Sequence, residues 1–131
     1  MSTLETVAHA GRIVMVGCGS IGQAVLPLLS KHIQTASDSV IVLSADERGR
    51  GIAQANGARF IHCHLKPTSF DRQLCQYLRA GDLLLNLSVD VSSHDLVEWC
   101  AEQGVLYVDT SIEPWPGVFD NPMFSLRERT N

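Results

Sequence analysis

The sequence predicts an α/β fold built on a doubly wound parallel sheet of about five strands. Short runs of branched apolar residues alternate with longer segments whose apolar residues recur three and four positions apart. These are the patterns of buried strands and of amphipathic helices. A glycine-rich turn at residues 17–22 separates the first run from the first helical segment. Such an alternation within 131 residues favours one domain whose parallel strands are joined by helical crossovers.

The first strand and the first helix lie on either side of the glycine turn. Residues 12–16, Arg-Ile-Val-Met-Val, form a short apolar run and predict a strand buried on both faces. From Ser20 to about His32 the apolar residues follow a helical spacing, which predicts an amphipathic helix. Pro27 lies inside this segment. We expect it to bend the helix, because proline removes one backbone donor.

The same alternation continues through the middle of the chain. Residues 39–43, Ser-Val-Ile-Val-Leu, predict a second strand. A helix is expected from Glu47 to Asn56, with Gly57 at its end. Residues 59–64 then predict a third strand.

Another helix and strand follow. Thr68 has a side chain suited to a helix N-cap, and the helix after it is expected to run through Leu78 and Arg79. Gly81 would end this helix. Residues 82–87 predict the fourth strand.

The last helix and strand complete the predicted sheet. Ser92 or Ser93 caps a helix that ends at Gly104, and residues 105–108 predict the fifth strand. The result is a Rossmann-like arrangement in which helices connect parallel strands. The carboxyl ends of all five strands then share one edge of the sheet.

The pattern changes after Asp109. Residues 110–117 contain two prolines and a glycine and predict a loop, and the chain from residue 119 onwards is irregular. We assign residues 1–117 to one domain and residues 118–131 to an exit segment that leads towards a further catalytic region. A six-stranded dinucleotide fold has one strand more than predicted here, so we expect an incomplete fold.

Composition excludes several classes of protein. Ten Lys and Arg against 14 Asp and Glu give a net charge of −4, which argues against binding nucleic acid or an anionic membrane. No apolar run approaches the ~18 residues that cross a bilayer. The first ten residues lack the basic and apolar regions of a signal peptide. We therefore expect a cytoplasmic protein that does not contact a membrane.

Neither the cysteines nor the histidines predict a metal site. The four cysteines have irregular spacings and indicate buried free thiols, not a disulfide framework or a zinc site. They are Cys18, Cys63, Cys75 and Cys100. His62 and His64, two apart on a predicted strand, share one face, but the sequence places no third ligand beside them.

The glycine turn predicts dinucleotide binding. Gly17-Cys-Gly-Ser-Ile-Gly22 has the pattern G-x-G-x-x-G between a strand and a helix. In this position glycines permit a tight turn, close approach to a pyrophosphate and close helix packing. The helix N-terminus adds free N–H groups that point at the phosphates. A methyltransferase turn of the form GxGxG would need glycine at position 21, where this chain has Ile21.

An acidic residue after the second strand favours NAD over NADP. Asp46 lies where a carboxylate hydrogen-bonds the adenosine ribose, although its distance from the glycine turn is longer than usual. Arg48 and Arg50 follow closely and can instead hold the 2′-phosphate of NADP. The alternative role of Asp46 is to cap the next helix.

Two further segments lie at the carboxyl ends of predicted strands, where ligands bind in such sheets. Residues 86–90 follow the fourth strand, and their alternative role is a plain connection to the next helix. Residues 109–113 follow the fifth and lead to Trp115 between two prolines. Glu113 and Trp115 offer a carboxylate and an aromatic ring on a stiff loop, a combination suited to an organic cation. The alternative is a solvated glutamate beside a packing tryptophan.

Three strings together resemble the bacterial homospermidine synthases, members of the saccharopine dehydrogenase-like group. They are the glycine turn through Gln23, residues 86–93 (Asn-Leu-Ser-Val-Asp-Val-Ser-Ser) and residues 109–117 (Asp-Thr-Ser-Ile-Glu-Pro-Trp-Pro-Gly). The resemblance covers nearly all of this chain but only the N-terminal NAD-binding part of the family protein. It implies NAD-dependent conversion of putrescine to homospermidine by oxidation, imine formation and reduction, and it implies that this part alone is inactive.

The resemblance also implies roles for individual residues. Glu113 would lie beside the nicotinamide as the catalytic carboxylate and hold the diamine together with Trp115. The expected cofactor-binding residues are Gly17, Gly19, Ser20, Ile21, Gly22, Asp46, Leu87, Ser88, Val89 and Thr110. Competing interpretations are the cofactor domain of another saccharopine dehydrogenase-like oxidoreductase and a non-catalytic nucleotide-binding module. A homo-oligomer or a partner region that completes the enzyme is a further expectation.

Overall fold

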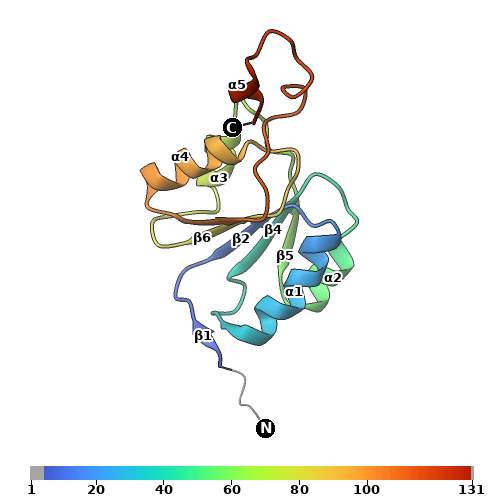
Figure 1. The fold of residues 1–131 in the computed structure, drawn as a ribbon. Coiled ribbons are helices and arrows are strands. Elements are labelled where there is room, and N and C mark those ends of the chain that lie inside the picture. Colours follow the sequence, from blue (N-terminus) through green and yellow to red (C-terminus); the bar gives the residue numbers. More distant parts are fainter. Residues whose placement is uncertain (1–4, 131) are drawn as a thin grey trace.

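The computed structural model describes residues 5–130 and contains the predicted five-stranded parallel sheet (Figure 1). Residues 1–4 of the expected 1–117 domain and residue 131 of the exit segment lie outside the described range. The strand order is β5-β4-β2-β6-β7, and every pairing is parallel. The strands are β2 (Ile13–Val16), β4 (Val40–Ser44), β5 (Arg59–His62), β6 (Leu83–Asn86) and β7 (Leu106–Asp109).

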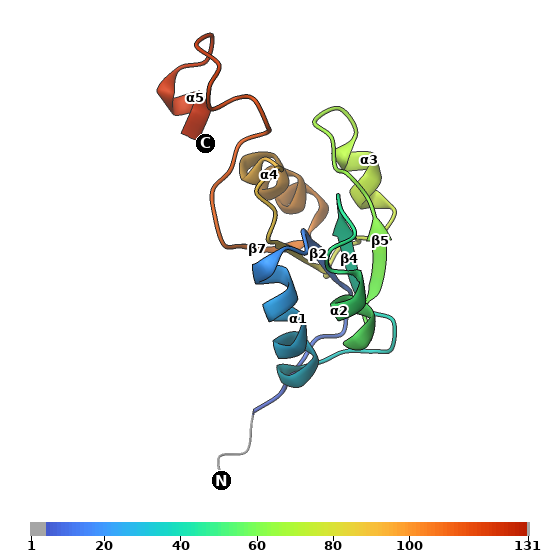
Figure 2. The ribbon, with the colours of Figure 1, turned by 90° about the vertical axis from the view of Figure 1, so that its right-hand side faces the viewer.

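Helices cover both faces of this sheet, as Figures 1 and 2 show. The helices α1 (Ser20–His32) and α2 (Arg50–Ala55) pack on one face, where Leu26 and Ala53 contact Met15 and Val42. The helices α3 (Phe70–Cys75) and α4 (Ser93–Gln103) cover the other face, with Leu74, Leu96 and Trp99 against Val14, Val16 and Leu84. Because both faces are covered, all four residues of β2 are buried, and the strand is apolar throughout instead of alternating.

The position of the central strand explains where a site can form. Val16, the last residue of β2, is in register with Leu43 of β4 on one side and with Asn86 of β6 on the other. The loops that follow these three strands therefore leave the sheet at the same edge. In a doubly wound sheet the order of the strands reverses at this point, which opens a crevice between the loops.

Two predicted helices have different bounds in the structure. The helix expected from Glu47 begins at Arg50, after an N-cap at Gly49 that has no side-chain hydrogen bond. Glu47 and its neighbours are instead held by local ion pairs, which compete with a helical turn. The helix expected to start after Thr68 and run through Arg79 is only six residues long, Phe70–Cys75, and begins after Ser69.

Three short elements were not predicted. The strands β1 (Val7–Ala8) and β3 (Ile33–Gln34) form a separate two-stranded parallel sheet beside the C-terminal end of α1. The exit segment was expected to be irregular, but α5 (Leu126–Thr130) forms within it. Figure 1 shows this segment extending away from the sheet beyond α4. Ser125 explains the helix start, because its hydroxyl and Glu128 hydrogen-bond reciprocally in the manner of a capping box.

The cysteines follow the prediction only in part. All four are free, and Cys18 and Cys100 are buried, but Cys63 is half-buried and Cys75 is exposed. Cys75 is the last residue of the short α3, and its side chain is exposed to solvent. In the described part of the chain no helix has the length and apolar character needed to span a bilayer.

Candidate nucleotide-binding site

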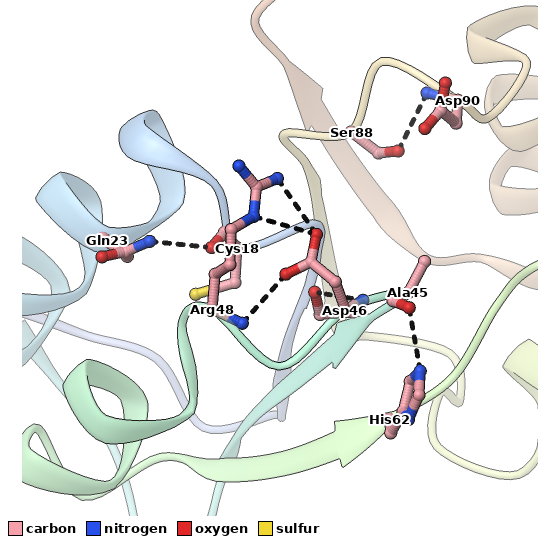
Figure 3. Close-up of polar contacts among 9 residues, drawn as sticks. Cys18, Gln23, Ala45, Asp46, Arg48, His62, Ser88 and Asp90 are labelled. Atoms are coloured by element: carbon pink, nitrogen blue, oxygen red, sulfur yellow. Dashed lines mark hydrogen bonds and ion pairs between the residues drawn. The ribbon is translucent and has the colours of Figure 1, made fainter.

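The loops after β2, β4 and β6 enclose a pocket of about 300 Å³ at the carboxyl edge of the sheet. Figure 3 shows part of it, with Arg48 and Asp46 on one side and Ser88 and Asp90 on the other. The pocket brings together most of the predicted cofactor residues. Its lining consists of Gly17, Cys18, Gly19, Ser20, Ile21, Ser44, Ala45, Asp46, Arg48, Leu87, Ser88, Val89 and Asp90.

Gly17 is required by the backbone of the fold, whereas Gly19 is not. Gly17 has φ +89°, which L side chains rarely adopt, and a Cβ there would lie 2.9 Å from the Ser88 backbone nitrogen. Gly17 thus allows the glycine turn to contact the loop after β6. Gly19 has open space around it, since a Cβ would meet no atom within 4 Å. The fold itself does not require glycine at position 19, whereas a ligand that approaches the backbone would.

The helix that begins at this turn offers donors to an anion. Gly19 is the N-cap of α1 and makes no side-chain cap hydrogen bond, and the first turn contains no acidic residue. The first N–H groups of a helix have no partner within the helix, and the helix dipole favours a negative charge there. Gly22 lies in the first turn of α1, where a Cβ would be 2.9 Å from the Gly17 carbonyl oxygen. The open space at Gly19 and the uncapped N-terminus of this 13-residue helix fit a dinucleotide pyrophosphate.

Asp46 and Arg48 form an ion pair at the side of the pocket. The Asp46 carboxylate accepts three hydrogen bonds from Arg48, from its backbone N–H (2.9 Å), Nε (3.1 Å) and Nη2 (3.0 Å). These hydrogen bonds lower the pKa of Asp46, which stays charged at neutral pH. Helix α2 is capped at Gly49, so Asp46 is not the N-cap that the alternative prediction required. Its carboxylate is positioned for a ribose but shares its oxygens with a guanidinium.

The second arginine of this loop does not line the pocket. Arg50 pairs with Glu47, and its guanidinium lies over the ring of Phe60, 4.5 Å from the centroid. Glu47 also faces His62, whose other ring nitrogen hydrogen-bonds the Ala45 carbonyl oxygen at 2.8 Å (Figure 3). Of the two arginines considered for a 2′-phosphate, the structure therefore places only Arg48 in the pocket.

Below the loop after β6 lies a buried polar network. The Asn86 side chain accepts from the Ser88 N–H (3.1 Å) and donates to the Tyr107 hydroxyl (3.1 Å). Tyr107 in turn donates to the Asp109 carboxylate at 2.8 Å. Burial raises the pKa of Tyr107 well above its usual value, so the hydroxyl keeps the proton that it donates. The network fixes the start of the loop that forms one wall of the pocket.

The residues predicted after the fifth strand lie elsewhere. Thr110 is exposed, Glu113 and Trp115 are half-buried, and none of the three lines the pocket. Trp115 donates its indole N–H to Asp95 of α4 at 2.6 Å and packs against Phe70, with ring centroids 5.6 Å apart. Among residues 5–130, the Glu113 carboxylate makes no hydrogen bond or ion pair, while its backbone is held by α4.

Sequence reasoning missed several lining residues. Ser44 is the last residue of β4 and Ala45 follows it, directly before Asp46. Their positions at the end of a strand would have identified them. Asp90 belongs to the segment 86–90 that was expected at the site, and Cys18 lies inside the predicted glycine turn, but neither was named as a cofactor-binding residue. The Cys18 thiol is buried against Gly49, which joins the glycine turn to the loop after β4.

A possible cluster of metal ligands lies on α4 and does not include His62 or His64. In the part of the chain that the structure describes, one group of three possible metal ligands occurs, His94, Asp95 and Glu98 on α4. His94 and Glu98 are exposed, and Asp95 already accepts the Trp115 indole N–H.

Comparison with known proteins gives consistent matches. A family model described as "Saccharopine dehydrogenase NADP binding domain" matches residues 13–131. Homospermidine synthases from Blastochloris viridis and Mesorhizobium japonicum are 38% and 34% identical over 124 residues, 92% of this chain. The chain spans about a quarter (26%) of the length of these curated relatives.

A solved structure is also similar. The crystal structure of a homospermidine synthase from Legionella pneumophila in complex with NAD superposes with a TM-score of 0.84 at 27% identity. The match covers 96% of this chain and 27% of that protein. The sequence relatives and the structural neighbour therefore agree with the resemblance that the three strings predicted.

Proposed function

Because the chain belongs to the saccharopine dehydrogenase NADP binding domain family, we propose that it is the NAD-binding part of a homospermidine synthase. The main support is the pocket at the carboxyl edge of the sheet, which is lined by the glycine turn, Asp46 and the Leu87–Val89 loop. The relatives' names and the NAD in the Legionella structure support this choice over other nucleotide-binding modules.

Each wall of the pocket has a separate task in this proposal. The α1 N-terminus and the space above Gly19 receive the pyrophosphate, since they offer free donors and no obstructing side chain. Asp46 accepts hydrogen bonds from the adenosine ribose, which favours NAD because a 2′-phosphate would face a carboxylate. Leu87, Ser88 and Val89 cover the nicotinamide half, with Thr110 nearer the reacting end.

Glu113 supplies the acid–base chemistry in the proposed reaction. When bound, NAD would supply a hydride acceptor for the amine-bearing carbon of one diamine and would return the hydride to the imine that a second diamine forms at that carbon with release of ammonia. Hydride leaves a carbon that carries an amine only when that amine is neutral. A carboxylate that attracts the ammonium group and accepts its proton therefore assists the first step. The Glu113 carboxylate has no hydrogen-bond or ion-pair partner among residues 5–130, so it is available to a ligand.

Putrescine is the proposed substrate, and Trp115 would contact its cationic end. The aromatic ring is anchored by Asp95 and Phe70, which fixes its position relative to Glu113 two residues earlier.

We further propose a cytoplasmic enzyme with no membrane or nucleic-acid partner. Self-association or a further catalytic region would complete the substrate pocket.

Titration calorimetry with NAD and, separately, with NADP tests the cofactor step. We expect saturable binding with preference for NAD, and no homospermidine from putrescine with this chain alone, which corresponds to a quarter of its relatives. Absence of binding to either nucleotide by a chain with a folded circular dichroism spectrum would contradict the proposal. Preference for NADP would favour the cofactor domain of another oxidoreductase in the family.

The role of Glu113 is tested by Glu113→Gln in an enzyme that carries this domain. We expect turnover to fall at least a hundredfold, within the usual contribution of an acid–base group, while NAD affinity changes less than twofold. The amide keeps the size of the side chain but cannot take a proton. Equal losses of turnover and of NAD affinity would contradict the assigned role.

A further inference from the structure

The backbone of Glu113 is held by one buried residue of α4. Ser93 has 4% of its surface exposed and contacts the Glu113 segment through three hydrogen bonds. Its hydroxyl donates to the Ser111 carbonyl oxygen (3.0 Å) and accepts from the Glu113 N–H (3.0 Å). Its own N–H donates to the Glu113 carbonyl oxygen at 2.8 Å.

These bonds use every backbone polar group of Glu113 and leave its side chain uncommitted. A serine hydroxyl can donate once and accept at the same time, which is what the contacts to Ser111 and Glu113 require. On the far side of Glu113, Pro114 is buried and Trp115 is bonded to Asp95. The backbone on both sides of the carboxylate is therefore anchored to the first turn of α4.

The neighbouring serine performs a different task. Ser92 is the N-cap of α4, and its side chain accepts from the Asp95 N–H at 3.2 Å. Capping of the helix thus depends on Ser92, whereas two of the three bonds to the Glu113 segment depend on the Ser93 hydroxyl and the third comes from the Ser93 backbone N–H. The two adjacent serines are equally buried, but Ser92 stabilises the helix start and Ser93 positions the loop.

We propose that Ser93 is the positioning residue for Glu113, and that it holds this carboxylate at the carboxyl edge of the sheet for a diamine. The inference rests on the proposed function, since it assigns Ser93 a task in the same reaction. Ser93 does not line the nucleotide pocket. Its hydroxyl also lies beside Tyr107, so we expect Ser93 to act mainly on the diamine step and to have only a small effect on NAD binding.

Amide hydrogen exchange in the 131-residue chain tests the anchoring directly. In Ser93→Ala we expect the Glu113 amide to exchange at least tenfold faster relative to core amides of α4, since its acceptor is gone. Ser93→Thr keeps the hydroxyl and should restore protection. Ser92→Ala is the matched control, and there the Glu113 amide should follow only the general loss of stability. Equal effects of the two alanine variants, or full protection in Ser93→Ala, would overturn the proposal.

A double-mutant cycle tests whether Ser93 acts through the carboxylate. In an enzyme that carries this domain, with NAD bound and putrescine as the probe, Ser93→Ala should weaken putrescine binding about tenfold and leave the Kd for NAD within twofold. In a Glu113→Gln background the same change should have little further effect. Additive losses would overturn the proposal. If the otherwise unaltered enzyme binds NAD but not putrescine, the proposed diamine function fails, and amide exchange alone decides the role of Ser93.

Discussion

The ion pair of Asp46 and Arg48 makes cofactor choice depend on two side chains. Arg48 occupies the carboxylate oxygens that ribose hydroxyls would use, and it is the one arginine of this loop that lines the pocket. A 2′-phosphate would be repelled by Asp46 and attracted by Arg48. The pocket therefore contains one residue that favours NAD and one that tolerates NADP.

We expect Arg48→Ala to raise the preference for NAD over NADP about tenfold, or about 1.4 kcal/mol, because the cation near the 2′ position is lost. The ratio of the two dissociation constants from calorimetry measures this change. Arg50→Ala is the matched control, since Arg50 is held by Glu47 and Phe60 outside the pocket. An equal shift in both variants would refute the assignment of Arg48.

Gly19 separates cofactor binding from folding. We expect Gly19→Ala to weaken NAD binding at least tenfold, about 1.4 kcal/mol, without loss of stability, because the added methyl enters space that only a ligand fills. Calorimetry and thermal unfolding measure the two effects. Gly51→Ala also meets no atom within 4 Å but lies on α2 outside the pocket, and it should leave affinity unchanged. Unchanged affinity in Gly19→Ala would mean that the pyrophosphate lies elsewhere.

At the scale of the elements, α1 contains the clearest local conflict. It continues from Ser20 to His32 across Pro27, which lacks the N–H that would bond the preceding turn. Pro27 is exposed, so its ring is not needed for packing. We expect Pro27→Ala to raise the free energy of unfolding by about 1–2 kcal/mol, less than the full cost of a helical proline because the unfolded chain also gains freedom.

Urea denaturation measures this change, with Ser30→Ala as the control. Ser30 is exposed on the same helix, and its replacement should add about 0.5 kcal/mol or less, through helix propensity alone. A destabilised Pro27→Ala protein would show that the proline is required by the structure of α1.

The sequence predicted the long elements well and the short ones poorly. The apolar runs and helical periods located all five strands of the main sheet, and Ser92 was correctly among the predicted caps. The strands β1 and β3 have two residues each, too few for a period of two to be visible. The start of α2 was misplaced because two local ion pairs, Asp46 with Arg48 and Glu47 with Arg50, hold the residues before Gly49 outside the helix, and the apolar spacing carries no sign of them.

The site was predicted to a similar degree. Strand ends and the glycine pattern identified the pocket, because the topology brings the carboxyl ends of parallel strands together. The hydrogen bonds between Ser93 and Glu113 could not be predicted. A serine at the start of a helix indicates an N-cap, and the sequence does not show that it bonds a residue 20 positions away. The roles of Glu113 and Trp115 in catalysis stay predictions.

For the whole molecule, the two edges of the sheet differ in their protection. The edge strand β5 exposes Arg59 and His62, polar residues that discourage pairing with another strand. The edge strand β7 exposes Leu106 (57%) and Val108 (51%) on one face. An apolar strand with an unpaired edge is a site for association between copies.

We therefore expect this chain to self-associate through β7 as its concentration rises, in sedimentation velocity experiments. Val108→Lys should shift the distribution towards monomer, because a charge on the exposed face opposes burial. Ile52→Lys alters another exposed apolar residue, on α2, and should have no such effect. A monomer at all concentrations, or equal effects of the two lysine variants, would contradict this expectation.

The central place of β2 has a consequence for how the protein is made. Among the five strands of the main sheet, β2 is synthesised first, yet its second neighbour, β6, ends only at Asn86. A ribosome adds about 5–20 residues per second, so β2 waits several seconds with one side unpaired. We expect the nascent chain during that interval to expose part of the apolar segment Ile13–Val16, which is fully buried in the folded protein. We expect a chaperone that meets this chain on the ribosome to bind there first.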